Sequence, residues 1–271
     1  GLDVSFKEYQ DGLDQTAFVA TGGADFGIST AMEIIPSIAN GNDVIALGAI
    51  HQLSPQAFAS LTKEHISTPL DFKGKILGAK GGNQQAIVAY KALLNQYGLN
   101  DKVATIKNLD YSVDVDGDLL QHRSDMVDLY RTDEPYIFQK KGISYTLLLP
   151  ENFGFKTYGD VLITSNAMLK SNHDIVAGFV KATFAGWQYA LSHKEEALTV
   201  TKKYQNASYA DPAKEKYILE QSIPLILTTG GRQLGTMDYV VWNQSVKQLQ
   251  NAGIINNGFD VTKMYTNKFL Q

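Results

Sequence analysis

Two short apolar runs near the start of the chain constrain its fold more than any other feature. Residues 24–30 (Ala-Asp-Phe-Gly-Ile-Ser-Thr) and residues 43–52 both end in small or polar residues. This pattern is typical of buried parallel strands whose carboxyl ends open into a crevice. Residues 31–41 lie between the runs, have the apolar spacing of a helix and end at a glycine. Together they predict a strand–helix–strand unit, and ligands of open α/β sheets bind at such strand tips.

Charge and cysteine usage exclude several classes of protein. The net charge of -4 at pH 7 offers no basic face to nucleic acid or anionic lipid. No apolar run approaches the roughly 18 residues that a membrane span requires. The 271 residues include no cysteine, which rules out disulfides, thiolate metal sites and cysteine nucleophiles. We therefore expect neither a nucleic-acid partner nor thiol chemistry.

The order of the remaining elements indicates an α/β protein throughout. Further strands are predicted at residues 56–62, 76–79, 103–106, 126–130, 144–150 and 161–165, and helices at 84–98, 135–141, 173–193, from 194, 212–221 and 239–251. The chain is expected to cross between two groups of strands near residues 75–79 and 157–161. This division predicts a first lobe of residues 1–76 and 160–271 and a second lobe of residues 77–159, with the ligand between them.

Five short motifs resemble, in order and spacing, the type 2 periplasmic solute-binding proteins. They are residues 24–27, 50–55, 70–75, 132–136 and 158–160. The resemblance spans essentially the whole chain, and it is strongest to the thiamine-pyrimidine (hydroxymethylpyrimidine) synthases and the formylaminopyrimidine-binding proteins. It implies an α/β fold of two lobes, each a mixed sheet flanked by helices. Members of this group usually begin with a strand and a helix that carry an aromatic pocket segment, and we expect the first lobe to lack that segment here.

The resemblance also implies a function. A protein of this kind binds a small polar heterocycle, such as a pyrimidine or a thiamine precursor, between its lobes in the periplasm or another extracytoplasmic space, and it is not an enzyme. Its partner is the membrane part of an ABC importer or, for a sensor domain, a membrane-linked kinase or diguanylate cyclase; residues 51–55 and 132–136 slightly favour the sensor. The alternative is an enzyme similar to the synthases, but their chemistry is associated with iron and a cysteine-rich segment. We expect a monomer in isolation.

Polar residues at two strand tips are candidate ligand contacts. Ser29 and Thr30 follow the first strand, where hydroxyls and the free N–H groups of a helix start can hold a polar ligand. Their alternative role is helix capping. His51 and Gln52 follow the second strand, and a neutral imidazole beside an amide can read the donors and acceptors of a heterocycle. A structural histidine is the alternative there.

A glycine-containing loop supplies further candidates. Gly82 and Asn83 precede a helix and allow the backbone to approach a ligand closely, although Asn83 is also a natural N-cap.

The acidic segment is residues 132–134. Asp133 and Glu134 are costly to desolvate unless something pairs with them, and an amino-bearing ligand near Thr132 would supply the partner. Capping and a salt bridge to a neighbour are the alternative. Tyr158 and Asp160 stand at the expected return crossing, where hinge and pocket coincide. Their alternative role is in the hinge alone.

Residues 112–123 resemble a calcium-binding loop at first sight, because aspartates alternate there. Aligning Gly117 with the invariant glycine of such a loop puts Arg123 where a bidentate glutamate is required. The histidines nowhere stand at metal-ligand spacing. The sequence therefore predicts no metal and no cofactor.

Overall fold

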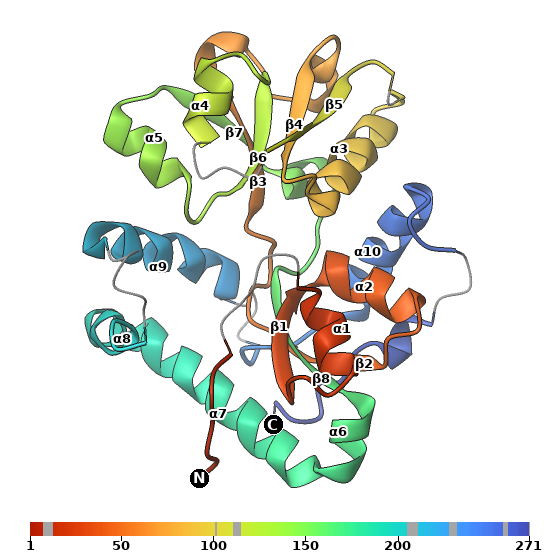
Figure 1. Ribbon diagram of the computed structural model, residues 1–271, viewed down its shortest axis with the longest axis vertical. Coiled ribbons are helices and arrows are strands. Elements are labelled where there is room, and N and C mark those ends of the chain that lie inside the picture. Colours follow the sequence, from red (N-terminus) through yellow and green to blue (C-terminus); the bar gives the residue numbers. More distant parts are fainter. Residues whose placement is uncertain are drawn as a thin grey trace.

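Two sheets, each with helices on both faces, lie one above the other along the long axis of the molecule (Figure 1). The computed structural model describes residues 1–7, 13–100, 102–110, 115–204, 211–227, 232–256 and 260–270. Within these ranges, no helix combines the length and the apolar character needed to cross a membrane.

The lower sheet has three strands, in the order β1 (Phe26–Thr30), β8 (Asp160–Ser165) and β2 (Val44–Ala49). β8 is antiparallel to both neighbours. The predicted strand–helix–strand unit is confirmed, since β1 and β2 run in the same direction and α2 (Ala31–Ala39) joins them. A strand from much later in the chain nevertheless separates them. Thr30 at the tip of β1 stands opposite Asp160 at the start of β8.

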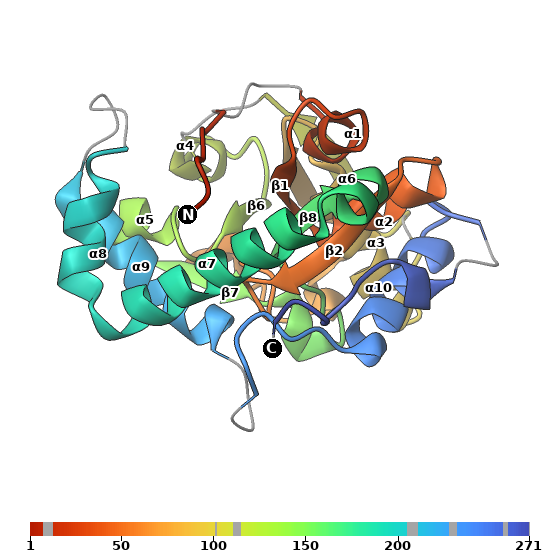
Figure 2. The same cartoon turned by 90° about the horizontal axis from the view of Figure 1, so that it is seen from below.

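Helices cover both faces of this sheet. Figure 2 shows α7 (His173–Ser192) crossing one face, where Val180 and Phe184 pack on Leu47 and Leu162. The opposite face is covered by α1 (Gln15–Ala20), α2 and α10 (Tyr239–Asn251). The other helices of this half are α6 (Asn166–Ser171), α8 (Lys194–Thr201) and α9 (Pro212–Ile226).

The upper sheet has five strands. Their order is β5 (Thr105–Leu109), β4 (Ile76–Lys80), β6 (Met126–Tyr130), β3 (Gln56–Leu61) and β7 (Tyr145–Leu148). β3 is antiparallel to β6 and β7, whereas β4 is parallel to β5 and β6. One face packs on α3 (Gln84–Gln96), and the other packs on α4 (Val115–Leu120) and α5 (Pro135–Lys141). The sheet is therefore mixed, as the resemblance implied.

The membership of β3 corrects the expected first crossing. β3 pairs with β6 and β7 in the upper sheet, so the chain leaves the lower sheet between β2 and β3 and not near residues 75–79. All six residues of β3 are buried, and such a strand carries no signal in its own sequence for the sheet it joins. We therefore propose that the lobes divide at residues 50–55 and 149–159, with the lower lobe formed by the described residues within 1–49 and 160–270.

The two crossing segments are held together by backbone hydrogen bonds. The N–H of His51 donates to the carbonyl of Asp160 (3.1 Å), and the N–H of Gly159 donates to the carbonyl of His51 (3.2 Å). The N–H of Ser54 donates to the carbonyl of Thr157 (2.9 Å). These bonds make the crossings a short two-chain ribbon between the lobes.

A capped turn on the upper lobe gives a first testable prediction. Oδ2 of Asp71 accepts hydrogen bonds from the N–H groups and hydroxyls of Ser67 and Thr68, and the backbone bond from Ser67 contributes most to lowering the pKa of Asp71. Asp71→Ala should lower the free energy of unfolding by about 1 kcal/mol near neutral pH, as loss of a cap does.

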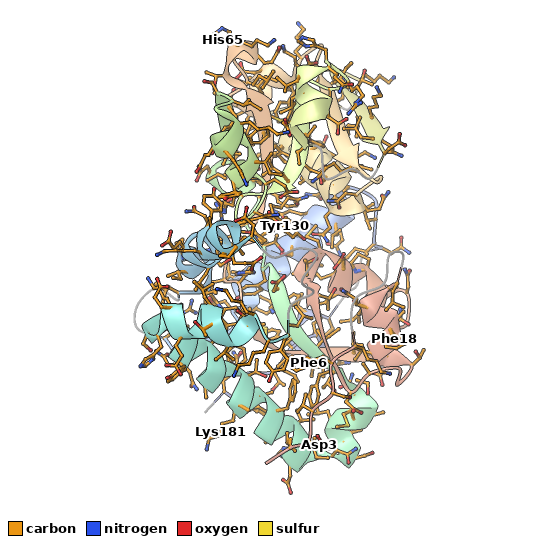
Figure 3. All side chains as sticks on the ribbon, turned by 60° about the vertical axis from the view of Figure 1, so that its left-hand side comes forward. Asp3, Phe6, Phe18, His65, Tyr130 and Lys181 are labelled. Atoms are coloured by element: carbon orange, nitrogen blue, oxygen red, sulfur yellow. The ribbon has the colours of Figure 1, made fainter. Side chains whose placement is uncertain are left out.

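The predicted effect of Asp71→Ala should depend on pH. A lowered folded-state pKa gives stability that is present above the ordinary value of 3.8 and is lost as the pH falls through the folded value. Urea unfolding of both proteins, near neutral pH and again in acid below the folded-state pKa of Asp71, measures the difference in the free energy of unfolding. Asp3→Ala, at the exposed start of the chain (Figure 3), is the control. A difference that persists unchanged in acid would contradict the explanation.

Candidate functional site

A cavity of about 950 Å³ lies between the two lobes and takes residues from both. The lower lobe contributes the start of α1, the tip of β1, α2 and Asp160, and the upper lobe contributes the loop before α3 and Tyr130 at the end of β6. Figure 3 shows Tyr130 at the level where the lobes meet. The polar lining comprises Asp14, Gln15, Thr16, Ser29, Thr30, Glu33, Ser37, Asn40, Asn42, Asn83, Gln84, Gln85, Tyr130 and Asp160. A second cavity, beside the crossing at Gln56, has about 10 Å³, room for roughly one water.

Ser29 and Thr30 line the cavity, and Thr30 is also the N-cap of α2. Oε2 of Glu33 accepts from the hydroxyl of Ser29 (2.8 Å), the N–H of Thr30 (3.2 Å) and the hydroxyl of Thr30 (3.3 Å). Thr16 of α1 donates its hydroxyl to Ser29 (3.2 Å). The β1 tip is thus a preformed polar surface whose hydroxyls are directed by Glu33. Capping and cavity lining, which the sequence offered as alternatives, occur together at Thr30.

Asn83 also lines the cavity, and its side chain already has partners. Its Oδ1 accepts from the N–H of Gln85 (3.1 Å), and its Nδ2 donates to Oδ2 of Asp128 (2.7 Å). Burial raises the pKa of Asp128. Gly82 has a φ of +69°, which favours glycine, and it lies beside Asn108 and outside the lining. Of this loop and the start of α3, Gly81, Asn83, Gln84 and Gln85 line the cavity.

His51, Gln52 and Tyr158 lie in the crossing segments and are buried, outside the cavity lining. Nε2 of Gln52 donates to the backbone at the end of β2 (2.9 Å). The hydroxyl of Tyr158 accepts from the N–H of Asp238 (2.6 Å), and burial raises the pKa of Tyr158 to about 12. Nδ1 of His51 is 3.1 Å from Oδ2 of Asp160, which does line the cavity. The crossing segments, residues 50–55 and 149–159, are called the hinge below; they are packed together, with Asp160 at their edge.

The two carboxylates of the acidic segment form ion pairs with lysines of the protein. Asp133 is 2.6 Å from Nζ of Lys214, and Glu134 is 2.5 Å from Nζ of Lys80. Thr132 is buried, and none of the three lines the cavity. The expectation that these carboxylates need a cationic partner agrees with the structure, but lysines from distant parts of the chain supply it. Their position gives no support to ligand contact at this segment.

The pair of Asp133 with Lys214 belongs to a second bridge between the lobes, where α5 meets the start of α9 (Figure 1). There Asp211 accepts from Nζ of Lys140 (3.1 Å) and from the hydroxyl of Tyr136 (3.3 Å). This α5–α9 contact and the hinge hold the lobes at different places. The cavity opens between them on the side of α1, α2 and α3.

Several lining residues were missed from the sequence. Asp14 accepts from the N–H of Ala17 (2.9 Å) and is the N-cap of α1, a signal that an Asp before a short apolar run does give. Glu33 looks like an ordinary residue of the first helical turn. Tyr130 ends β6 and is its exposed residue, so strand-tip reasoning applied to every strand would have included it.

The rejected calcium loop is partly described. Residues 111–114 lie outside the described residues, while Asp116 pairs with Lys141 (2.8 Å) and Asp118 with Arg123 (2.6 Å). Among the described residues, no group of three or more His, Asp or Glu side chains is arranged to hold a metal ion.

Comparisons with known proteins agree with this architecture. The sequence profile of a family described as NMT1/THI5 like matches residues 1–197. Riboflavin-binding protein RibY of Chloroflexus aurantiacus is 22% identical over 99% of this chain and 76% of the relative. The 4-amino-5-hydroxymethyl-2-methylpyrimidine phosphate synthase of Legionella pneumophila is 22% identical over 99% of this chain and 83% of the relative. The structure of the periplasmic aliphatic sulphonate binding protein SsuA of Escherichia coli matches with a TM-score of 0.70 and 14% identity, over 91% of this chain and 77% of that one. The chain therefore has the α/β fold of the periplasmic binding proteins.

Proposed function

We propose that this chain, which belongs to the NMT1/THI5-like family, binds a small polar heterocyclic solute between its lobes and leaves it chemically unchanged. The observation that carries the proposal is the cavity of about 950 Å³, which residues of both lobes line. A solute that touches both lobes binds the closed arrangement more tightly than an open one, so it shifts the population towards closure. The closed form is then what a partner recognises.

The size and lining of the cavity support a heterocycle of the pyrimidine or flavin type. Pockets for small molecules measure roughly 300–1,000 Å³, with apolar walls and a few polar groups that fix orientation. Here Ile28 and Tyr130 supply exposed apolar surface beside the polar tips of β1 and α3. The similarity to a riboflavin-binding protein points the same way.

We infer an extracytoplasmic location and a membrane partner from the same likeness. The structural similarity to a periplasmic binding protein favours delivery to an ABC importer. A sensor domain attached to a kinase or cyclase remains the second reading, and the full-length gene separates the two. A membrane span followed by a signalling domain would identify the sensor.

The rival function is synthesis of a pyrimidine, which the similarity to the Legionella pneumophila enzyme favours. Incubation with iron and pyridoxal phosphate, followed by mass spectrometry, tests it directly. A pyrimidine product that grows with time would overturn the binding proposal. Recovery of an added pyrimidine unchanged, with no new product, is the expected result.

A thermal-shift screen tests binding itself. The panel contains pyrimidines, thiamine fragments, riboflavin, alkanesulfonates and amino acids. A solute at about 100 times its Kd should add about 2.7 kcal/mol to the free energy of unfolding and raise Tm accordingly. We expect that rise with a pyrimidine or a flavin. If no heterocycle in the panel raises Tm, the proposed function is wrong.

A further inference from the structure

The charged side chains that line the cavity between the lobes are all negative within the described lining. Its described lining includes three carboxylates, those of Asp14, Glu33 and Asp160, and within that described lining there is no lysine, arginine or histidine. Lys80, next to the α3 loop, is paired with Glu134 at 2.5 Å. An anionic solute would therefore lose its hydration beside like charges and meet no opposite charge in this lining, which is costly.

Two of these carboxylates, those of Glu33 and Asp160, are accessible from the cavity. Oε2 of Glu33 is fixed by the β1 tip, and Glu33 is an exposed residue, so its other oxygen remains open to a solute. Asp160 keeps 39% of its side chain exposed. Both belong to the lower lobe, and they lie close to one another because Thr30, which Glu33 binds, pairs with Asp160 in the sheet.

A buried imidazole is directed at this group from the hinge. His51 is 7% exposed, and neither ring nitrogen makes a hydrogen bond within the described residues. Nδ1 nevertheless lies 3.1 Å from Oδ2 of Asp160, a close contact that is not aligned as a hydrogen bond. His51 thus stands behind one oxygen of Asp160 and leaves the other to the cavity.

Tyr130 faces the carboxylates from the upper lobe. It ends β6 with 39% of its surface exposed, and it lines the same cavity. Desolvation of its hydroxyl raises the pKa of Tyr130, and the negative charges of Asp160 and Glu33, which line the same cavity, raise that pKa further. An aromatic ring opposite a pair of carboxylates suits a flat ligand that carries N–H donors.

Resting on the proposed function, we propose that Glu33, Asp160 and Tyr130 select a flat heterocycle that bears an amino group, neutral or cationic, and reject anionic solutes. The carboxylates accept N–H bonds, which are strong because the acceptors are charged, and Tyr130 stacks on the ring. A cationic ring gains further from the face of the tyrosine. Such selection by charge would give this chain a ligand preference different from that of a protein that binds sulfonates or phosphate esters.

Isothermal titration with four probes tests this selectivity. They are an amino-hydroxymethylpyrimidine, its analogue with a methyl in place of the amino group, its phosphate monoester, and ethanesulfonate. We expect binding of the first, weakening of about 10-fold or more for the methyl analogue, and no measurable binding of the two anions. Tighter binding of either anion would overturn the selectivity while leaving solute binding intact. If no heterocycle binds, both proposals fail.

Three substitutions locate the selecting groups. Asp160→Asn and Glu33→Gln keep the shape of each side chain and should weaken the aminopyrimidine by about 10- to 100-fold, with a smaller effect on the methyl analogue. Tyr130→Ala should weaken both compounds. Asp174→Asn, on the exposed face of α7, is the matched control and should change neither. Equal affinities for wild type and Asp160→Asn, with unfolding midpoints alike, would contradict the assignment.

Discussion

Replacing Trp242 by alanine is expected to lower the free energy of unfolding by about 3–5 kcal/mol, the range for large aromatic side chains in a core. Trp242 is fully buried on α10, and its ring lies 5.5 Å from that of Tyr158 and 6.0 Å from that of Tyr265. Its removal leaves a void at the junction of α10 with the hinge, because Tyr158 is itself hydrogen-bonded to Asp238 just before this helix.

Urea unfolding, with the midpoint and the m-value fitted together, measures the effect of Trp242→Ala. Tyr239→Ala is the control on the same helix, because Tyr239 is 49% exposed, and it should change stability by no more than about 0.5 kcal/mol. A loss below about 1 kcal/mol for Trp242→Ala would mean that the surrounding residues collapse into the void.

Gly159→Ala should destabilise the protein by about 1–3 kcal/mol and also weaken solute binding. A Cβ at this position would lie 2.7 Å from Cδ of Pro55 and 2.9 Å from Cβ of His51, closer than such atoms approach. Both neighbours belong to the opposite crossing segment. The two segments must therefore separate, and the lobes that they carry would meet a solute in an altered geometry.

Unfolding and titration of the same sample separate the two effects of Gly159→Ala. Gly186→Ala on α7 is the matched control, since nothing lies within 4 Å of the added Cβ. That change should stabilise the protein by about 0.5–1 kcal/mol, because alanine is the better helix former. A Gly159→Ala protein with native stability and native affinity would show that the crossings tolerate separation.

Local elements were predictable because their signals are local. β6 and α10 have the predicted bounds, residues 126–130 and 239–251, since a short apolar run and a 3.6-residue periodicity identify them without tertiary information. Sheet membership was not predictable in the same way. β3 and β8 are both apolar runs, yet β3 joins the upper sheet and β8 enters the lower one between β1 and β2. Strand pairing depends on residues far away in sequence.

The same limit applies to the site. Ser29 and Thr30 were expected from the tip of a strand and Asp160 from the return crossing, and all three line one cavity because Thr30 pairs with Asp160 in the sheet. Asp133 lies outside this cavity, and its partner Lys214 comes from a helix that begins far along the chain. Two adjacent carboxylates next to a buried strand indicate that a cation must pair with them. The sequence alone does not tell whether a solute or a side chain of the protein provides that cation.

The order of strands has a consequence for how the chain reaches its native state. The upper sheet is built from consecutive segments, β3 to β7, so its pairings close comparatively short loops. The lower sheet needs β8 between β1 and β2. Its pairings therefore close longer loops, which contain the whole upper lobe. Until β8 pairs with them, β1 and β2 lack the strand that joins them, and we expect their apolar surface to be exposed. We therefore expect the lower lobe to complete its sheet after the upper one.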